Sequence, residues 1–161
     1  MKLLIIYDSL HGNTKKIADS ISKSLDNSKV LSVEQVSLQN LKDINMLVVG
    51  SPTHGGTAKK ELLQFLNSVP DNYLKDIYVA SFDTRFKEEN LNIFLKLLVK
   101  TIGYAATKIL KMLENKGGLH ITDPEGFFVK DTSGPLLEGE FERASKWGTD
   151  LKSKYIDLSK K

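Results

Sequence analysis

The segment that decides the fold is LLIIYDSLHGNT, residues 3–14. Its first five residues form a continuous apolar run, which is typical of a strand buried on both faces of a parallel sheet. From Asn13 onward the apolar residues recur at helical spacing, so that Ile17 and Ile21 share one face. A buried strand that runs through a short polar loop into a helix predicts the start of an α/β fold.

The rest of the chain alternates in the same way between short apolar runs and amphipathic stretches. Further strands are expected at 30–38, 46–49 and 77–82, with two short extended pieces at 119–121 and 127–129. Helices are expected at 13–25, 62–66, 91–113 and 137–158, the third of them broken near Gly103. Strands that alternate with helices imply right-handed crossovers and helices on both faces of a parallel sheet. We therefore predict a three-layer α/β/α sandwich with a five-stranded parallel sheet, formed by residues 1–161 as a single domain.

Composition and charge exclude several classes of protein. Of 161 residues, 40% are hydrophobic and 27% charged, and there is no cysteine, which excludes disulfides, iron–sulfur clusters and a cysteine nucleophile. The net charge of +3 comes from no basic block, so we expect no nucleic-acid binding. Three histidines and no acidic cluster at ligand spacing predict no metal. No apolar run reaches the ~18 residues of a membrane span, and the apolar start is too short for a signal peptide, so we expect a cytoplasmic protein.

The loop that follows the first strand has the chemistry of an anion site. Ligands of such sheets bind beyond the carboxyl ends of the strands, so the loops after residues 7, 49 and 82 are the candidates. Ser9, Asn13 and Thr14 supply side-chain donors, and a helix that begins at once adds free N–H groups and its positive dipole end. Phosphate is the natural occupant; the alternative is that these are only turn and helix-cap residues. The P-loop and dinucleotide fingerprints are both absent.

These residues resemble the FMN-phosphate signature of the flavodoxin family. The pattern Ile5-Ile6-Tyr7-x-Ser9-x-x-Gly12-x-Thr14-x-x-x-Ala18-x-x-Ile21 matches that signature at every specified position. The resemblance covers nearly the whole chain and implies a flavodoxin-like fold that binds one FMN noncovalently. It assigns the phosphate to Ser9, Leu10, His11, Gly12, Asn13 and Thr14, although many members of the family have Thr in place of His11.

The resemblance assigns the flavin ring to the next two loops. It implies that Ser51, Pro52, Thr53, His54 and Gly55 pack beside the ring, and that Asp83, Thr84, Arg85 and Phe86 cover its other side. We expect His54 to contact the flavin, the alternative being an exposed loop histidine. For Arg85, a place near the flavin N1 and C2 carbonyl and a surface salt bridge to Glu88 or Glu89 are equal alternatives. Asp83 is expected to order its loop as a hydrogen-bond acceptor.

The family resemblance also implies a function. In an electron carrier the flavin does the chemistry, so no side chain is expected to act as a catalytic acid, base or nucleophile. We expect a low-potential carrier that exchanges electrons with donor and acceptor proteins. Typical flavodoxins are strongly acidic, so the positive net charge predicts a less negative potential than theirs. The alternative is an FMN-dependent oxidoreductase of a quinone or another hydrophobic substrate, similar to the flavodoxin-like protoporphyrinogen oxidases; we favour the carrier over a substrate-specific enzyme.

One stretch, residues 87–102, is longer than a minimal flavodoxin needs and rich in Leu, Ile, Phe and Val. We expect it to form a core helix of the α/β fold. The alternative is an apolar wall for a hydrophobic substrate, a partner or a membrane surface. We expect no membrane contact, and if one exists this segment is where it would form.

Overall fold

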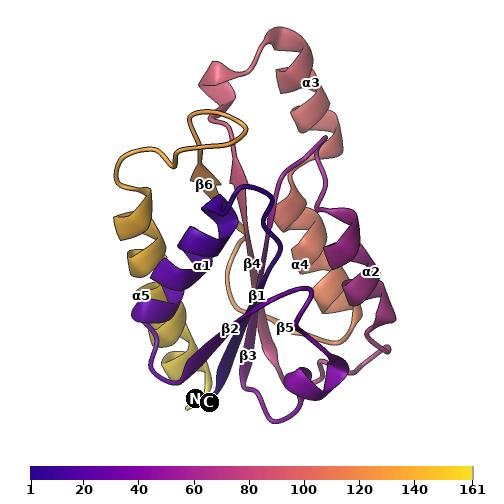
Figure 1. The fold of residues 1–161 in the computed structure, drawn as a ribbon. Coiled ribbons are helices and arrows are strands. Elements are labelled where there is room, and N and C mark those ends of the chain that lie inside the picture. The colour runs from indigo at the N-terminus through magenta and orange to yellow at the C-terminus, as the bar shows by residue number, and fades with distance from the viewer. Residues whose placement is uncertain (161) are drawn as a thin grey trace.

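The computed structural model describes residues 1–160, with the side chains of Leu95 and Leu98 left out. The strands are β1 (Leu3–Tyr7), β2 (Ser28–Ser32), β3 (Met46–Pro52), β4 (Tyr78–Arg85), β5 (Leu119–His120) and β6 (Glu125–Phe128). The helices are α1 (Asn13–Lys23), α2 (Lys60–Ser68), α3 (Ile93–Ile102), α4 (Ala105–Asn115) and α5 (Glu140–Leu158), with short 3₁₀ helices at Leu38–Leu41 and Glu88–Asn90. The alternation of strands and helices follows the prediction closely (Figure 1).

The strands form one parallel sheet in the order β2-β1-β3-β4-β5, and β6 also pairs with β4. β5 pairs with Tyr78 and Val79 at the start of β4, whereas β6 pairs with Phe82–Arg85 at its end. The two short strands therefore share the fifth position of the sheet, as the two predicted extended pieces do. The predicted three-layer sandwich with five strand positions is confirmed.

Each face of the sheet is covered by two helices and carries its own apolar core. On one face Ile5 and Phe82 pack against α1 and α5, and on the other Ile6 and Val49 pack against α2 and α4 (Figure 1). The alternate residues of β1 point to opposite faces, and both sets are buried, which is why its sequence is a continuous apolar run. The two packed faces leave the carboxyl ends of the strands open for loops.

Several predicted boundaries were wrong. The strands expected at 46–49 and 77–82 continue to Pro52 and Arg85, so Ser51, Pro52 and residues 83–85 lie in strands rather than in loops. The strand expected at 30–38 ends at Ser32, because the N–H of Gln35 donates to the carbonyl of Ser32 at 3.0 Å and closes a turn. The last helix begins at Glu140 rather than at 137, since Gly139 occupies its N-cap with a left-handed φ of 83°. The predicted break near Gly103 is confirmed: Gly103 has a φ of 82° and separates α3 from α4.

The expectation that residues 87–102 form a core helix was also wrong. The segment contains a helix, α3, but Ile93 is 88% exposed, Phe94 70% and Leu97 64%. α4 covers the sheet beside α2, and α3 extends beyond the carboxyl ends of the strands (Figure 1). Apolar content alone therefore misplaced this helix. Within residues 1–160, every helix is too short or too polar to cross a bilayer.

Candidate functional site

A cleft of about 730 Å³ lies at the carboxyl ends of β1, β3 and β4. This volume is within the range of small-molecule sites, roughly 300–1,000 Å³. Most of the predicted site residues line the cleft: Ser9, Leu10, His11, Asn13, Thr14, Pro52, Thr53, His54, Gly55, Thr84, Arg85 and Phe86. Gly12, Ser51 and Asp83 are not among the lining residues. Local sequence reasoning did not assign Gly56, Thr57, Ala58, Lys59, Lys60, Glu61, Leu63, Val129 and Thr132 to the site. Leu91 and Val99 also line the cleft, and they belong to the 87–102 segment for which an apolar wall was the alternative.

The loop after β1 leaves its hydrogen-bond donors available. Gly12 is the N-cap of α1, with a left-handed φ of 82°, and this position makes no side-chain cap hydrogen bond. The Ser9 hydroxyl is buried and has no hydrogen-bond partner within residues 1–160. The Ser9 hydroxyl therefore makes no cap or turn hydrogen bond of the kind that the alternative assigned to it. Buried groups without partners are rare, so this arrangement indicates a place for an external acceptor.

Two hydrogen bonds hold this loop against distant parts of the chain. The Asn13 Nδ2 donates to the carbonyl of Ser133 at 3.1 Å, and the hydroxyls of Thr14 and Thr84 are 2.9 Å apart. The amide of Asn13, expected as a ligand donor, is thus partly committed to the structure. Thr132 lines the cleft next to Ser133. The sequence Ser133-Gly134-Pro135 predicted only the start of the last helix. Nothing in it indicated the hydrogen bond between Asn13 and Ser133.

An ion pair that the sequence did not indicate lies beside the same loop. The Lys59 Nζ donates to Asp8 Oδ1 at 2.9 Å, and the Asp8 side chain is almost completely buried. This hydrogen bond raises the pKa of Lys59, while burial opposes the rise. The other oxygen of Asp8 is buried without a hydrogen-bond partner among the described residues. Lys59 neutralises a carboxylate that would otherwise repel an anion bound at the adjacent loop.

The loop after β3 forms a small closed turn at the cleft. The N–H of His54 donates to the carbonyl of Thr57 at 2.9 Å, and the N–H of Thr57 donates back at 3.1 Å. Gly55 and Gly56 between them have left-handed φ values of 56° and 74°. The His54 side chain is exposed and lines the cleft. Ser51 is fully buried, and its hydroxyl accepts from the N–H of Lys59 at 3.1 Å, so its role is to position the start of α2.

Asp83 ties three parts of the site together. Its buried carboxylate accepts from the hydroxyl of Thr53 and from the N–H of Ala106, each at 2.9 Å, and its Oδ1 lies 2.7 Å from the Arg85 Nε. Burial raises the pKa of Asp83, and Arg85 and the two hydrogen bonds oppose the rise. The expected role of Asp83 as a loop-ordering acceptor is confirmed. The carboxylate joins the end of β4 to the loop after β3 and to the start of α4.

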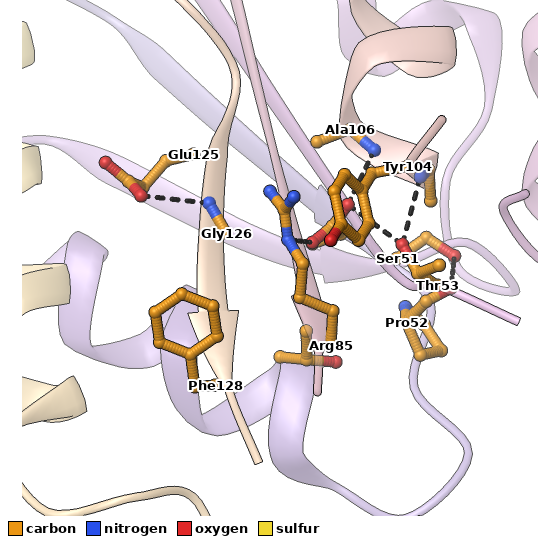
Figure 2. Close-up of polar contacts among 12 residues, drawn as sticks. Ser51, Pro52, Thr53, Arg85, Tyr104, Ala106, Glu125, Gly126 and Phe128 are labelled. Atoms are coloured by element: carbon orange, nitrogen blue, oxygen red, sulfur yellow. Dashed lines mark hydrogen bonds and ion pairs between the residues drawn. The ribbon is translucent and has the colours of Figure 1, made fainter. Parts of the chain in front are cut away.

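Arg85 is held firmly in the wall of the cleft. Its guanidinium lies 3.7 Å from the centre of the Tyr104 ring, so that a cation–π contact adds to the ion pair with Asp83 (Figure 2). A Cβ at Gly126 would collide with the guanidinium, so β6 approaches it closely. The alternative of a surface salt bridge to Glu88 or Glu89 is wrong: Glu88 accepts from the Tyr104 hydroxyl at 2.7 Å, and Glu89 lies 3.6 Å from Lys87. The structure thus fixes the guanidinium in the wall of the cleft, with its charge paired to the carboxylate of Asp83.

Comparison with known proteins identifies the family. A family model described as the flavodoxin domain matches residues 4–114. The chain belongs to the flavodoxin-domain family. This flavodoxin-domain protein is 33% identical to a flavodoxin from Aquifex aeolicus over 73 residues, which are 42% of this chain and 40% of that protein. It is 26% identical to an uncharacterized protein of Methanocaldococcus jannaschii over 144 residues, or 81% of this chain and 92% of that one.

The solved structures agree at the level of the fold. The crystal structure of oxidised flavodoxin 2 from Bacillus cereus superposes on this flavodoxin-domain protein with a TM-score of 0.73. The match covers 96% of this chain and 99% of that chain, at 24% sequence identity. The flavodoxin-like three-layer architecture of the chain is therefore established by its sequence family and by its shape together.

Proposed function

We propose that this protein binds one FMN in the cleft and works as a low-potential electron carrier. The observation that carries the proposal is the loop after β1, where a buried Ser9 hydroxyl without a partner lies next to the uncapped start of α1. A phosphate is the group that such a loop binds best, because it accepts several donors at once and interacts favourably with the helix dipole.

The residues of the cleft fit the rest of FMN as well. Ser9, Gly12, Asn13 and Thr14 would hold the phosphate through hydroxyl and backbone donors, and the Lys59–Asp8 pair keeps its surroundings from being negative. Thr53, His54, Gly55, Arg85 and Phe86 would border the flavin ring, since they line the same cleft. FMN supplies the redox chemistry when it is bound, because it can take up and release electrons.

The side chains around the cleft tune and orient rather than catalyse. Arg85 holds a guanidinium at a fixed place in the wall of the cleft, where Asp83 balances its charge. Asp83 accepts hydrogen bonds from Thr53 and Ala106 and pairs with Arg85, so its carboxylate holds the wall of the cleft together. Both features support a carrier in preference to an enzyme that uses acid–base catalysis. His54 is exposed at the cleft, where it would contact the flavin or its partner.

Binding of FMN and of riboflavin to the apoprotein tests the cofactor assignment. The two ligands differ only in the phosphate, so quenching of flavin fluorescence should give an FMN affinity at least about tenfold higher, the value of one or two charge-assisted hydrogen bonds. Equal affinities would contradict the phosphate site. If neither FMN nor riboflavin binds, the whole proposal is contradicted.

Electron transfer from the loaded protein tests the carrier role. After anaerobic reduction, the protein should pass its electrons to a one-electron acceptor such as a haem protein. It should turn over quinones or protoporphyrinogen no faster than free FMN does. Turnover well above the free-FMN control would instead support the oxidoreductase alternative.

A further inference from the structure

The apolar face of α3, formed by Ile93, Phe94 and Leu97, is the largest concentration of exposed apolar side chains that the structure describes. These positions fall within about 100° of the helix circumference, at 100° per residue, so they form one surface. Ile102 is a further exposed apolar residue on the same helix, at 39%. The exposed Leu10 and Phe141 belong to other parts of the chain. A surface of this kind costs free energy in water and indicates a binding role.

The charges of α3 have one sign. Lys96 and Lys100 are exposed and are its charged residues, and the helix contains no acidic residue. The two carboxylates that precede it are engaged elsewhere: Glu88 accepts from Tyr104, and Glu89 pairs with Lys87. The apolar face of α3 is therefore accompanied by positive charge only.

The position of α3 links this surface to the cleft. Val99 of α3 and Leu91 just before it line the cleft, while Phe94 and Leu97 do not. Ile102 packs close to Gly56 in the loop after β3, since a Cβ at Gly56 would lie 2.8 Å from its Cγ2. The Tyr104 hydroxyl donates to Glu88 at 2.7 Å and so joins the chain just after α3 to the chain just before it. The helix is thus fastened to the rim of the cleft and extends away from the sheet (Figure 1).

We propose that α3 is a membrane-docking helix that lies in the surface of an anionic lipid bilayer. An apolar helix of ten residues is too short to span a bilayer, for which about 20 are needed. Because this helix is also not buried in the protein core, the lipid–water interface is the membrane site that fits it. Phe94 and Leu97 would enter the acyl boundary, and Lys96 and Lys100 would contact anionic headgroups. A second copy on the same face would bring like charges together, which disfavours it.

Docking in this way would bring the rim of the cleft close to the bilayer. An electron donor or acceptor dissolved in lipid could then approach the cleft without crossing water. The docking proposal does not depend on FMN, because Phe94, Lys96, Leu97 and Lys100 do not line the cleft. Vesicle binding and FMN binding can therefore fail separately.

Sedimentation with lipid vesicles tests the proposal on the full chain. The protein should bind vesicles of phosphatidylcholine with phosphatidylglycerol and should bind vesicles of phosphatidylcholine alone much more weakly. Phe94→Ser with Leu97→Ser should weaken binding at least about tenfold, because two large apolar side chains no longer enter the lipid. Lys96→Gln with Lys100→Gln should weaken it about 25-fold, at roughly fivefold for each lysine.

Matched variants elsewhere on the surface control this experiment. Phe141→Ser removes an exposed phenylalanine of α5, and Lys29→Gln with Lys42→Gln removes two exposed lysines outside α3; both variants should bind vesicles like the parent. All variants should keep the FMN affinity and the melting temperature of the parent, since the altered side chains are exposed. Failure to bind anionic vesicles, or equal binding by the Phe94→Ser, Leu97→Ser variant, would overturn the proposal. Self-association in solution that this variant abolishes would also overturn it and would assign the face to contact between copies.

Discussion

The hydroxyl of Thr14 lies 2.9 Å from the hydroxyl of Thr84, and both side chains are buried. Thr14 is in the first turn of α1, and Thr84 is near the end of β4, 70 residues further along the chain. A hydroxyl can donate one hydrogen bond and accept others. Thr14 can therefore accept from Thr84 and direct its own proton toward a ligand in the cleft. The pair makes the end of β4 part of the proposed phosphate site.

This relationship predicts a selective effect of Thr14→Ala. The variant should bind FMN about tenfold or more weakly, because a hydrogen bond to a charged group is lost, while riboflavin binding should change by less than about threefold. Fluorescence titration with both ligands measures the difference. Thr14→Ser keeps the hydroxyl and should restore most of the FMN affinity. An equal loss for both ligands would place Thr14 outside the phosphate site.

The Lys59–Asp8 ion pair predicts that a substitution of Asp8 repairs the damage caused by a substitution of Lys59. Lys59→Met leaves the Asp8 carboxylate buried without its partner and should lower the free energy of unfolding by about 1–3 kcal/mol, less than for a fully buried pair because Lys59 is partly exposed. The same variant should weaken FMN more than riboflavin, since the uncompensated carboxylate repels the phosphate.

Adding Asp8→Asn to Lys59→Met removes the unpaired charge. The double variant should recover most of the stability in denaturant unfolding and most of the FMN affinity. A double variant that is as unstable as Lys59→Met would show that the packing of Lys59, rather than its charge, is what matters.

Two adjacent glycines should respond differently to the same substitution. Gly55 and Gly56 both have left-handed backbones, so an alanine at either position should cost about 1 kcal/mol of stability from strain. A Cβ at Gly55 meets nothing within 4 Å, whereas at Gly56 it would lie 2.8 Å from Ile102 and 3.1 Å from the carbonyl of Gly103. Gly56→Ala should therefore also displace the end of α3.

Urea unfolding and limited proteolysis separate the two effects. Gly55→Ala should show only the loss of stability. Gly56→Ala should in addition be cut faster within Ile93–Ile102. The same cleavage rate in both variants would mean that α3 does not depend on this contact.

Tyr104 should lose its proton at a higher pH than an ordinary tyrosine, and the free energy of unfolding should therefore change with pH in the alkaline range. Burial, together with the hydrogen bond to Glu88, raises the pKa of Tyr104 to about 12 from 10.0. The folded state then holds this proton more tightly than the unfolded state. The stability from this group is complete below pH 10 and is lost as the pH rises toward about 12. Tyr104→Phe should remove this part of the pH dependence.

A tyrosinate absorbance titration of the folded protein checks this prediction. The chain has five tyrosines, and the latest step of the titration should be absent from Tyr104→Phe. Glu88→Gln should shift the step to lower pH, because the negative charge beside the phenol is removed. A titration in which Tyr104→Phe keeps the late step would assign that step to another tyrosine.

Much of the fold and part of the site could be predicted from local sequence. The apolar run of β1 and the polar loop that follows it are contiguous, and their pattern depends only on burial on both faces of the sheet and on the chemistry of a helix start. Parallel strands then bring the loops after β1, β3 and β4 to one edge. This is why residues such as Ser9, Thr53 and Arg85 could be assigned to one cleft from the sequence.

What only the tertiary structure decided are the contacts between residues that are distant in the sequence. Lys59 pairs with Asp8, 51 positions earlier, and Asn13 donates to Ser133, 120 positions later. Arg85 packs against the ring of Tyr104, which follows α3. No periodicity or motif encodes such pairs, because they depend on where the loops close. The placement of α3 belongs to the same class: its apolar residues predict burial, but α4 already covers the sheet beside α2, so α3 remains exposed at the rim of the cleft.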